Sequence, residues 1–130
     1  MDIERLVDWH WNKGASNQSV LELVGQVESR LPDDYLALMR RHNGGEGFIG
    51  NEYLMLWRVE DIVAFNREYE VAEYAPGLLL FGSNGGGEAY AFDTRDNSMR
   101  IVQVPFVGMD IVDAIPIADS LTALLSGASQ

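Results

Sequence analysis

The chain has 130 residues and no cysteine, and its nine basic residues stand against twenty acidic ones, which gives a formal net charge of -11 at pH 7. The lack of cysteine excludes disulfides, thiolate metal sites and cysteine nucleophiles, and the acidity argues against nucleic-acid binding, which depends on Lys and Arg to neutralise phosphates. With 47% hydrophobic residues, the sequence predicts a single packed domain over residues 1–130.

The N-terminal segment predicts a helix over residues 1–14. Its helical spacing is carried by Ile3, Leu6, Val7 and His10. We interpret Trp9, His10 and Trp11 as an aromatic cap on the sheet rather than a ligand site, because large aromatic side chains favour cores. The sequence shows neither a signal peptide nor the run of roughly 18 apolar residues that a membrane span needs, so we expect a cytoplasmic protein without a membrane partner.

Two further helices are predicted before residue 45. Ser19 and Glu22 form a capping-box pattern for the first of them, and its apolar stripe consists of Val20, Leu23, Val24 and Val27. The second begins at Pro32, whose missing N–H would be unbonded in a first helical turn, and ends at Asn43-Gly44, where glycine supplies a left-handed residue. Its mostly apolar face consists of Tyr35, Leu38, Met39 and His42.

The middle of the chain predicts one strand and one helix. Residues 53–57 are dense in strand formers and apolar on both faces, which indicates a buried strand or a face used for binding. A helix then starts near Glu60-Asp61 and stops at Ala75-Pro76-Gly77. Its inner side is expected to consist of Ile62, Phe65, Tyr69 and Ala72.

From residue 78 onward the apolar pattern has a period of two. It predicts strands over residues 78–82, 88–93 and 99–106, joined by turns into an antiparallel meander. A closing helix is indicated by Ile117, Leu121, Leu124 and Leu125. Helices followed by consecutive hairpins predict an α+β domain in which helices pack against an antiparallel meander sheet.

The glycine-rich segment over residues 82–88 is better explained as a hairpin turn than as a phosphate loop. It lacks the Lys-Ser/Thr pair of a P-loop, and Glu88 puts a carboxylate where phosphate would bind. Glycine is what a turn with positive φ angles requires.

Candidate chemical sites are sparse. His10 and His42 share no ligand spacing, and the turn Asp93-x-x-Asp96-Asn97 lacks the spacing of an EF-hand, so we expect neither a metal nor another cofactor. No serine stands in a nucleophile elbow, and the paired carboxylates stand at predicted helix starts, where the helix dipole explains them. We therefore expect a protein that is not an enzyme.

Several motifs occur in a fixed order. Leu31-Pro32-x-x-Tyr35 precedes Asn43-Gly44-Gly45, a strand and helix follow from Tyr53, and residues 76–93 give a strand, a glycine-rich turn and a second strand. Over about residues 19–126 this set resembles the SUKH superfamily, which includes fungal cell-wall synthesis regulators and many bacterial immunity proteins. The resemblance implies structural roles for Leu31, Pro32, Tyr35, Asn43, Gly44, Gly45, Gly82, Gly86 and Gly87.

The acidity concentrates between residues 60 and 73, where five carboxylates accompany one arginine. A solvated helix face would explain this pattern. The resemblance implies another explanation, because proteins of this group often bind and block a cognate toxin, frequently a nuclease with a basic cleft that an acidic surface would attract. We hypothesise a partner-binding surface made of an exposed aromatic anchor and six carboxylates: Trp57, Glu60, Asp61, Glu68, Glu70, Glu73 and Glu88.

Two other functions stay open. The fungal members of the superfamily imply a regulatory scaffold that binds endogenous proteins. A small-molecule-binding or catalytic domain would instead need a concave pocket with convergent polar groups. The expected partner is a cognate toxin or another basic protein, with no role for nucleic acid.

Overall fold

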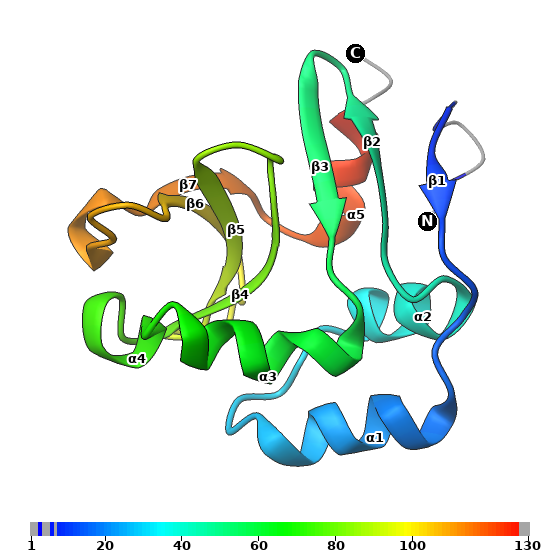
Figure 1. Ribbon diagram of the computed structural model, residues 1–130, viewed down its shortest axis with the longest axis horizontal. Helices are drawn as coiled ribbons and strands as arrows, with labels where there is room; N and C mark the ends of the chain where they lie inside the picture. The colour runs from blue at the N-terminus through cyan, green and yellow to red at the C-terminus, as the bar shows by residue number, and fades with distance from the viewer. Residues whose placement is uncertain (1–2, 4–5, 7, 128–130) are drawn as a thin grey trace.

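The computed structural model describes residue 3, residue 6 and residues 8–127, and within them a curled antiparallel sheet carries five α-helices (Figure 1). The strands are β1 (His10–Trp11), β2 (Gly45–Ile49), β3 (Glu52–Leu56), β4 (Leu78–Ser83), β5 (Glu88–Asp93), β6 (Ile101–Pro105) and β7 (Ile115–Ala118). The helices are α1 (Asn17–Gln26), α2 (Asp33–Arg41), α3 (Val59–Glu68), α4 (Val71–Tyr74) and α5 (Leu121–Ser126), with a short 3-10 helix, η2 (Ile111–Asp113). The predicted α+β class is confirmed.

Each strand pairs antiparallel with the next one along the chain, so the order across the sheet runs from β1 to β7. The predicted meander is confirmed as β4, β5 and β6, and the sheet extends beyond it at both ends. The sequence pattern does not predict β2, whose residues are rich in glycine, or β7, which contains Pro116. Proline is tolerated there because β7 is an edge strand.

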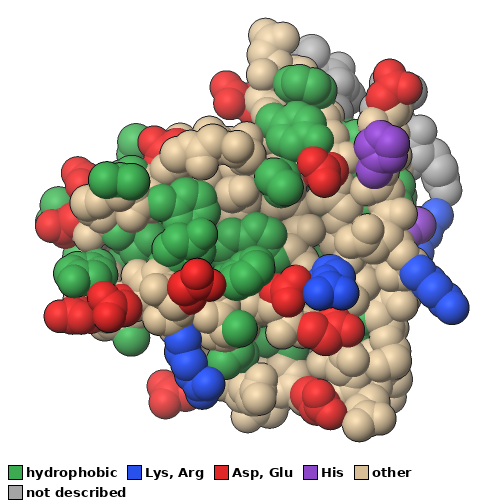
Figure 2. All heavy atoms as spheres, viewed as in Figure 1, with side chains coloured by type: hydrophobic (Ala, Val, Ile, Leu, Met, Phe, Trp, Pro, Cys, Tyr) green, Lys and Arg blue, Asp and Glu red, His purple; other side chains and the backbone are tan. Residues whose placement is uncertain are grey.

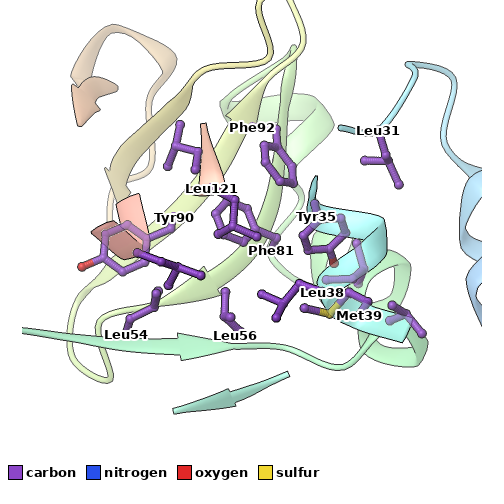
Figure 3. Close-up of a cluster of buried hydrophobic side chains, with 14 of the residues drawn as sticks. Leu31, Tyr35, Leu38, Met39, Leu54, Leu56, Phe81, Tyr90, Phe92 and Leu121 are labelled. Carbon is purple, nitrogen blue, oxygen red and sulfur yellow. The ribbon is translucent and has the colours of Figure 1, made fainter. Parts of the chain in front are cut away.

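The two faces of the sheet carry separate hydrophobic clusters, because successive side chains of a strand point to opposite faces. On one face of β5, Tyr90 and Phe92 join the main core, where Phe92 packs edge-on against Tyr35 of α2 with ring centroids 5.1 Å apart (Figure 3). On the other face, Ala89 and Ala91 belong to a second cluster that α4 covers. Trp57 and Phe106, which belong to the surface described below, pack against this second cluster.

The helix predicted over residues 1–14 is wrong in the part that the structure describes. His10–Trp11 form β1 and pair with Gly45–Glu46 of β2, and Trp9 donates a hydrogen bond of 2.9 Å from Nε1 to the Phe48 carbonyl. A Cβ at Gly47 would collide with the Trp9 ring, so the indole lies where β2 has no side chain. The other positions of the predicted helix include residues 1–2, 4–5 and 7, which lie outside the described residues.

The starts of two helices also differ from the predicted ones. Helix α1 is capped by Ser16, whose Oγ accepts from the Ser19 N–H at 3.1 Å, rather than by Ser19 itself. Helix α5 begins only at Leu121, after Ser120, whose Oγ accepts from Ala123 N–H at 3.0 Å. Ile117 therefore lies in β7 and not in the closing helix.

Candidate partner-binding surface

The start of α3 is fixed by Asn43, a buried residue that is only 7% exposed. Its Oδ1 accepts a hydrogen bond of 2.8 Å from the Val59 N–H, and its Nδ2 donates one of 2.7 Å to Glu60 Oε1. Arg58, the residue before α3, makes no side-chain cap hydrogen bond, so Asn43, from a distant part of the chain, takes the place of an N-cap residue for α3. The hydrogen bond from Asn43 is the main cause that holds the pKa of Glu60 below its ordinary value.

Asp61 is also engaged at the start of α3. Its Oδ2 lies 3.2 Å from Arg58 Nε, three residues earlier, in an ion pair that is partly open to solvent. Both carboxylates lie in the first turn of the helix, where the macrodipole favours negative charge. Glu60 and Asp61, two of the hypothesised partner-binding residues, therefore have partners within the fold.

The remaining residues of the first motif lie in or beside the main core. Leu31 is 3% exposed and Tyr35 1% exposed, and Pro32 precedes the first residue of α2 in an extended conformation. The Tyr35 hydroxyl makes no hydrogen bond within the described part of the chain, and burial raises the pKa of this phenol. Within the described structure these side chains contribute packing.

Two motif glycines are required by close backbone approach. Gly44 has a φ of 81°, and a Cβ there would collide with the Leu56 carbonyl oxygen. A Cβ at Gly82 would collide with the Met55 carbonyl oxygen in the same way. Gly45 lies against the β1 backbone, so the three glycines keep β1, β2, β3 and β4 in contact.

The glycine-rich turn between β4 and β5 is organised by Asn84. Its Oδ1 accepts hydrogen bonds from the Gly86 N–H at 2.9 Å and from the Glu88 N–H at 3.1 Å. The Gly87 carbonyl accepts from the Phe106 N–H at 2.9 Å, which ties the turn to the end of β6. The turn is a hairpin connection, as the sequence predicts.

The end of α3 forms an elbow that the sequence does not predict. Glu70 has a φ of 54°, a left-handed conformation that is uncommon for a residue other than glycine, and α4 restarts at the buried Val71. Because the helical phase is lost at this point, Tyr69 and Ala72 are exposed instead of lining the inner side of one long helix. This expectation for Tyr69 and Ala72 is therefore wrong.

The elbow carries three exposed carboxylates, which we call the acidic elbow: Glu68, Glu70 and Glu73. None of the three forms an ion pair within the described residues, in contrast to Asp61. The charges of Glu73 and Glu70 raise the pKa of the Tyr74 phenol, Glu73 having the larger effect. The acidic elbow thus presents uncompensated negative charge to solvent.

An aromatic face adjoins the acidic elbow on one side of α3, and it consists of Trp57, Phe65, Tyr69 and Phe106. Trp57 packs edge-on against Phe65 at 4.9 Å between ring centroids, and Tyr69 lies 4.7 Å from Phe106. Figure 2 shows hydrophobic side chains gathered above α3, with acidic side chains at the edge of the group. Trp57 is half-buried rather than exposed, so the expectation of an exposed Trp57 is wrong; Tyr69, at 40% exposed, is the open member of the set.

A groove of about 790 Å³ runs along the other side of α3. Its floor includes Val63 and Leu79, and its rim includes Arg67, Glu70 and Glu73. The acidic elbow therefore stands between this groove and the aromatic face.

Glu88 is set apart from the acidic elbow. It lies at the first position of β5, on the face that carries Tyr90 and opposite to Ala89. Phe106 of the aromatic face packs against the cluster that contains Ala89. The hypothesised acidic surface is thus divided by the sheet.

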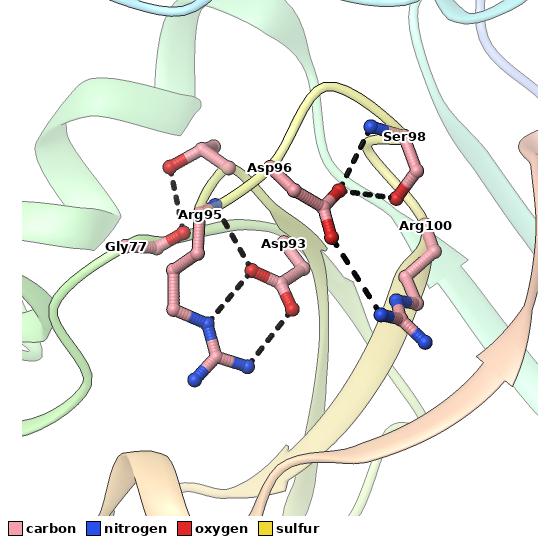
Figure 4. A network of polar contacts seen from close by, with 7 residues as sticks. Gly77, Asp93, Arg95, Asp96, Ser98 and Arg100 are labelled. Atoms are coloured by element: carbon pink, nitrogen blue, oxygen red, sulfur yellow. Dashed lines mark hydrogen bonds and ion pairs between the residues drawn. The ribbon is translucent and has the colours of Figure 1, made fainter.

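The acidic turn after β5 is neutralised by its own neighbours (Figure 4). Asp93, only 4% exposed, accepts hydrogen bonds of 2.9 Å from both Nε and Nη2 of Arg95, and Arg95 is the main cause that holds the pKa of Asp93 below its ordinary value. Asp96 accepts from the Ser98 N–H at 2.8 Å and lies 3.6 Å from Arg100. Within the described residues no group of three or more His, Cys, Asp or Glu side chains is arranged to hold a metal ion.

The fold is a small α+β domain, and comparison with known proteins gives its family. A model of the SMI1 / KNR4 family (SUKH-1) matches residues 14–127. The chain is also 30% identical over 109 residues to the "Uncharacterized protein YnaB" of Bacillus subtilis (strain 168), an alignment that covers 82% of this chain and 71% of that protein. The chain belongs to the SMI1 / KNR4 family (SUKH-1), which includes toxin-immunity proteins and whose members are generally immunity or regulatory proteins rather than enzymes.

The described helices are too short to span a membrane. Over residues 8–127 and the two described residues before them, no helix combines the length and the apolar character needed to cross a bilayer. The longest helices, α1 and α3, have ten residues each, whereas a span needs about 20.

Sequence reasoning missed the open aromatic residues of this surface. The helical spacing places Tyr69 in a buried stripe, and it gives no indication of Tyr74, which is 48% exposed. Phe106 ends a predicted strand, and its contact with Tyr69 joins two segments that are far apart in the sequence. The dense run of tyrosines and glutamates over residues 68–74 is the one sequence signal that could have identified the surface.

Proposed function

We propose that this protein is an immunity-type binding protein that neutralises a cognate toxin, of the nuclease class, by direct contact through the acidic elbow and the aromatic face. Membership of a family that includes toxin-immunity proteins supports this proposal. The observation that carries it is the set of exposed carboxylates Glu68, Glu70 and Glu73 without ion pairs in the described structure, next to the half-exposed Tyr69. Glu60, Asp61 and Glu88 contribute charge at longer range.

The proposed mechanism uses charge for attraction and aromatic area for affinity. A nuclease presents a basic cleft to the phosphates of its substrate, and an acidic patch is steered toward such a cleft, which raises the association rate. Tyrosines at the centre of an interface bury a large amphipathic surface and are frequent hot spots. Occupation of the cleft by the immunity protein excludes the nucleic acid, so no chemical step by this chain is required.

Co-expression with the product of the neighbouring gene tests the proposal. We expect that the neighbouring product stops growth when expressed alone, that this chain restores growth, and that the two proteins co-purify at low salt. A triple variant, Glu68→Gln, Glu70→Gln and Glu73→Gln, should lose much of the rescue, whereas Glu22→Gln on the exposed side of α1 should keep it. A neighbouring product that is harmless, or that stays toxic beside the folded chain, would contradict the proposal.

The regulatory alternative gives a different result in the same experiment. A scaffold of the fungal regulator type would restore no growth, and its loss would change the producing cell in the absence of any toxin. Tests with and without the neighbouring gene therefore separate the two functions.

A further inference from the structure

A second concave site lies on the opposite face of the sheet from the aromatic face. It is a pocket of about 410 Å³ between the end of the β2–β3 hairpin, the middle of the sheet and α5. This volume is within the range of small-ligand pockets, about 300–1,000 Å³. Its walls are mainly apolar and include Ile49, Leu54 and Leu124.

Tyr90 and Glu52 offer acceptors at this pocket, and Gln103 offers both an amide donor and a carbonyl acceptor. Tyr90 is only 4% exposed, and its hydroxyl donates one long hydrogen bond of 3.4 Å to the Tyr53 carbonyl, which leaves its oxygen lone pairs unused. Glu52 adds an exposed carboxylate to the lining. A ligand group that donates hydrogen bonds therefore suits Tyr90 and Glu52.

Glu88 adds a partly buried carboxylate near the pocket, although it is not one of the lining residues. It stands two residues before Tyr90 on the same face of β5, and its Oε2 is buried without a hydrogen bond in the described part of the chain. Burial, Glu52 and Glu88, in that order, raise the pKa of the Tyr90 phenol. A buried acceptor without a partner is costly, and a bound cation would remove that cost.

We propose that this pocket binds an alkylammonium group, with the aliphatic chain against Ile49, Leu54 and Leu124 and the ammonium between Tyr90 and the carboxylates of Glu52 and Glu88. An ammonium has three donors and no acceptor, and an aliphatic stem suits apolar walls. Such a group is found in free amines and in the lysine side chains of proteins. The inference is independent of the proposed immunity function, because it concerns the other face of the sheet.

Titration of the full chain with three pentyl compounds, followed by NMR, tests the proposal without any variant. We expect n-pentylammonium to shift the amide signals of Gln103, Ile117 and Leu124, which line or adjoin the pocket. Uncharged n-pentanol should bind at least about tenfold more weakly, because it lacks the charge-assisted hydrogen bonds, and pentanoate should not bind. Equal binding of pentanol, or shifts that map elsewhere, would overturn the proposal.

Three variants locate the ammonium. Tyr90→Phe and Glu88→Gln keep side-chain shape, and each should weaken n-pentylammonium binding about tenfold, the loss typical of one charge-assisted hydrogen bond. Glu22→Gln makes the same change of charge on the exposed side of α1 and should leave binding unchanged. If Glu22→Gln weakens binding as much as Glu88→Gln, general charge attraction accounts for the binding and the pocket does not.

A final arm identifies the source of the ammonium. A blocked pentapeptide with lysine at its centre should produce the same shifts as n-pentylammonium if the pocket takes a protein side chain, and the norleucine peptide should not. If only the free amine produces the shifts, the pocket takes a small molecule. Binding of the norleucine peptide at the same strength would contradict ammonium recognition.

Discussion

The two ends of α3 carry the same kind of residue and use it differently. At the N-terminal end Glu60 accepts a hydrogen bond of 2.7 Å from Asn43, and Asp61 pairs with Arg58. At the C-terminal end Glu68 and the two glutamates that follow it have no ion pair in the described structure. The number of acidic residues in a segment therefore overstates the charge that is available to a partner, because contacts within the fold already engage some of the carboxylates.

The largest effect is expected at the N-terminal end, from Asn43→Ala. The substitution leaves the buried Val59 N–H without its acceptor and Glu60 without its donor, so we expect a loss of about 2–4 kcal/mol in the free energy of unfolding. Urea denaturation measures this loss. Asn43→Asp keeps an acceptor for the Val59 N–H but repels Glu60, so its free energy of unfolding should lie between those of the wild-type protein and the alanine variant. A loss below about 1 kcal/mol for the alanine variant would contradict the difference between the two ends of α3.

A smaller effect is expected from Glu60→Gln. Because the folded protein holds the pKa of Glu60 below its ordinary value, the charged form adds stability at neutral pH, and this contribution disappears as the pH falls through the folded-state pKa. We expect a loss of about 0.3–1 kcal/mol at pH 7. Denaturation curves of both proteins should converge below about pH 4, and a difference that persists in acid would show that the charge of Glu60 is not responsible.

The smallest effect on stability is expected from the acidic elbow. The triple variant Glu68→Gln, Glu70→Gln and Glu73→Gln removes three exposed charges that form no ion pair within the described residues, so the free energy of unfolding should change by less than about 0.5 kcal/mol or should rise. Thermal denaturation at low salt measures this change in the free energy of unfolding. A loss as large as that of Asn43→Ala would mean that the elbow is a structural element like the N-terminal end.

Much of the fold follows from local sequence rules. Helix α2 is predicted because Pro32, its apolar face and Gly44 all agree, and its buried residues Tyr35, Leu38 and Met39 are the expected ones. Strands β4 and β5 are predicted because a period of two is interrupted by glycines that suit a tight turn. In these segments the signals lie within a few residues of the structure that they specify.

The missed features depend on distant or weak signals. Strand β1 has two residues, and the glycines of β2 leave room for Trp11 in it and for Trp9 just before it. The elbow at Glu70 contains neither glycine nor proline, so no local rule indicates it. The half-burial of Trp57 depends on Phe106, and the engagement of Glu60 depends on Asn43. The acidic candidates could be found from sequence, but their division into engaged and free groups requires the tertiary structure.

The association rate of this chain with its cognate toxin, measured as a function of salt concentration, is the most direct test of the acidic elbow as the partner-binding surface. We expect the rate for the wild-type protein to fall steeply with ionic strength, because exposed charges are screened. The triple variant of the acidic elbow should associate about tenfold more slowly at low salt and with a flatter salt dependence, whereas Glu22→Gln should match the wild-type protein. Equal rates and equal salt dependence for the wild-type protein and the triple variant would contradict the assignment of the acidic elbow as the partner-binding surface.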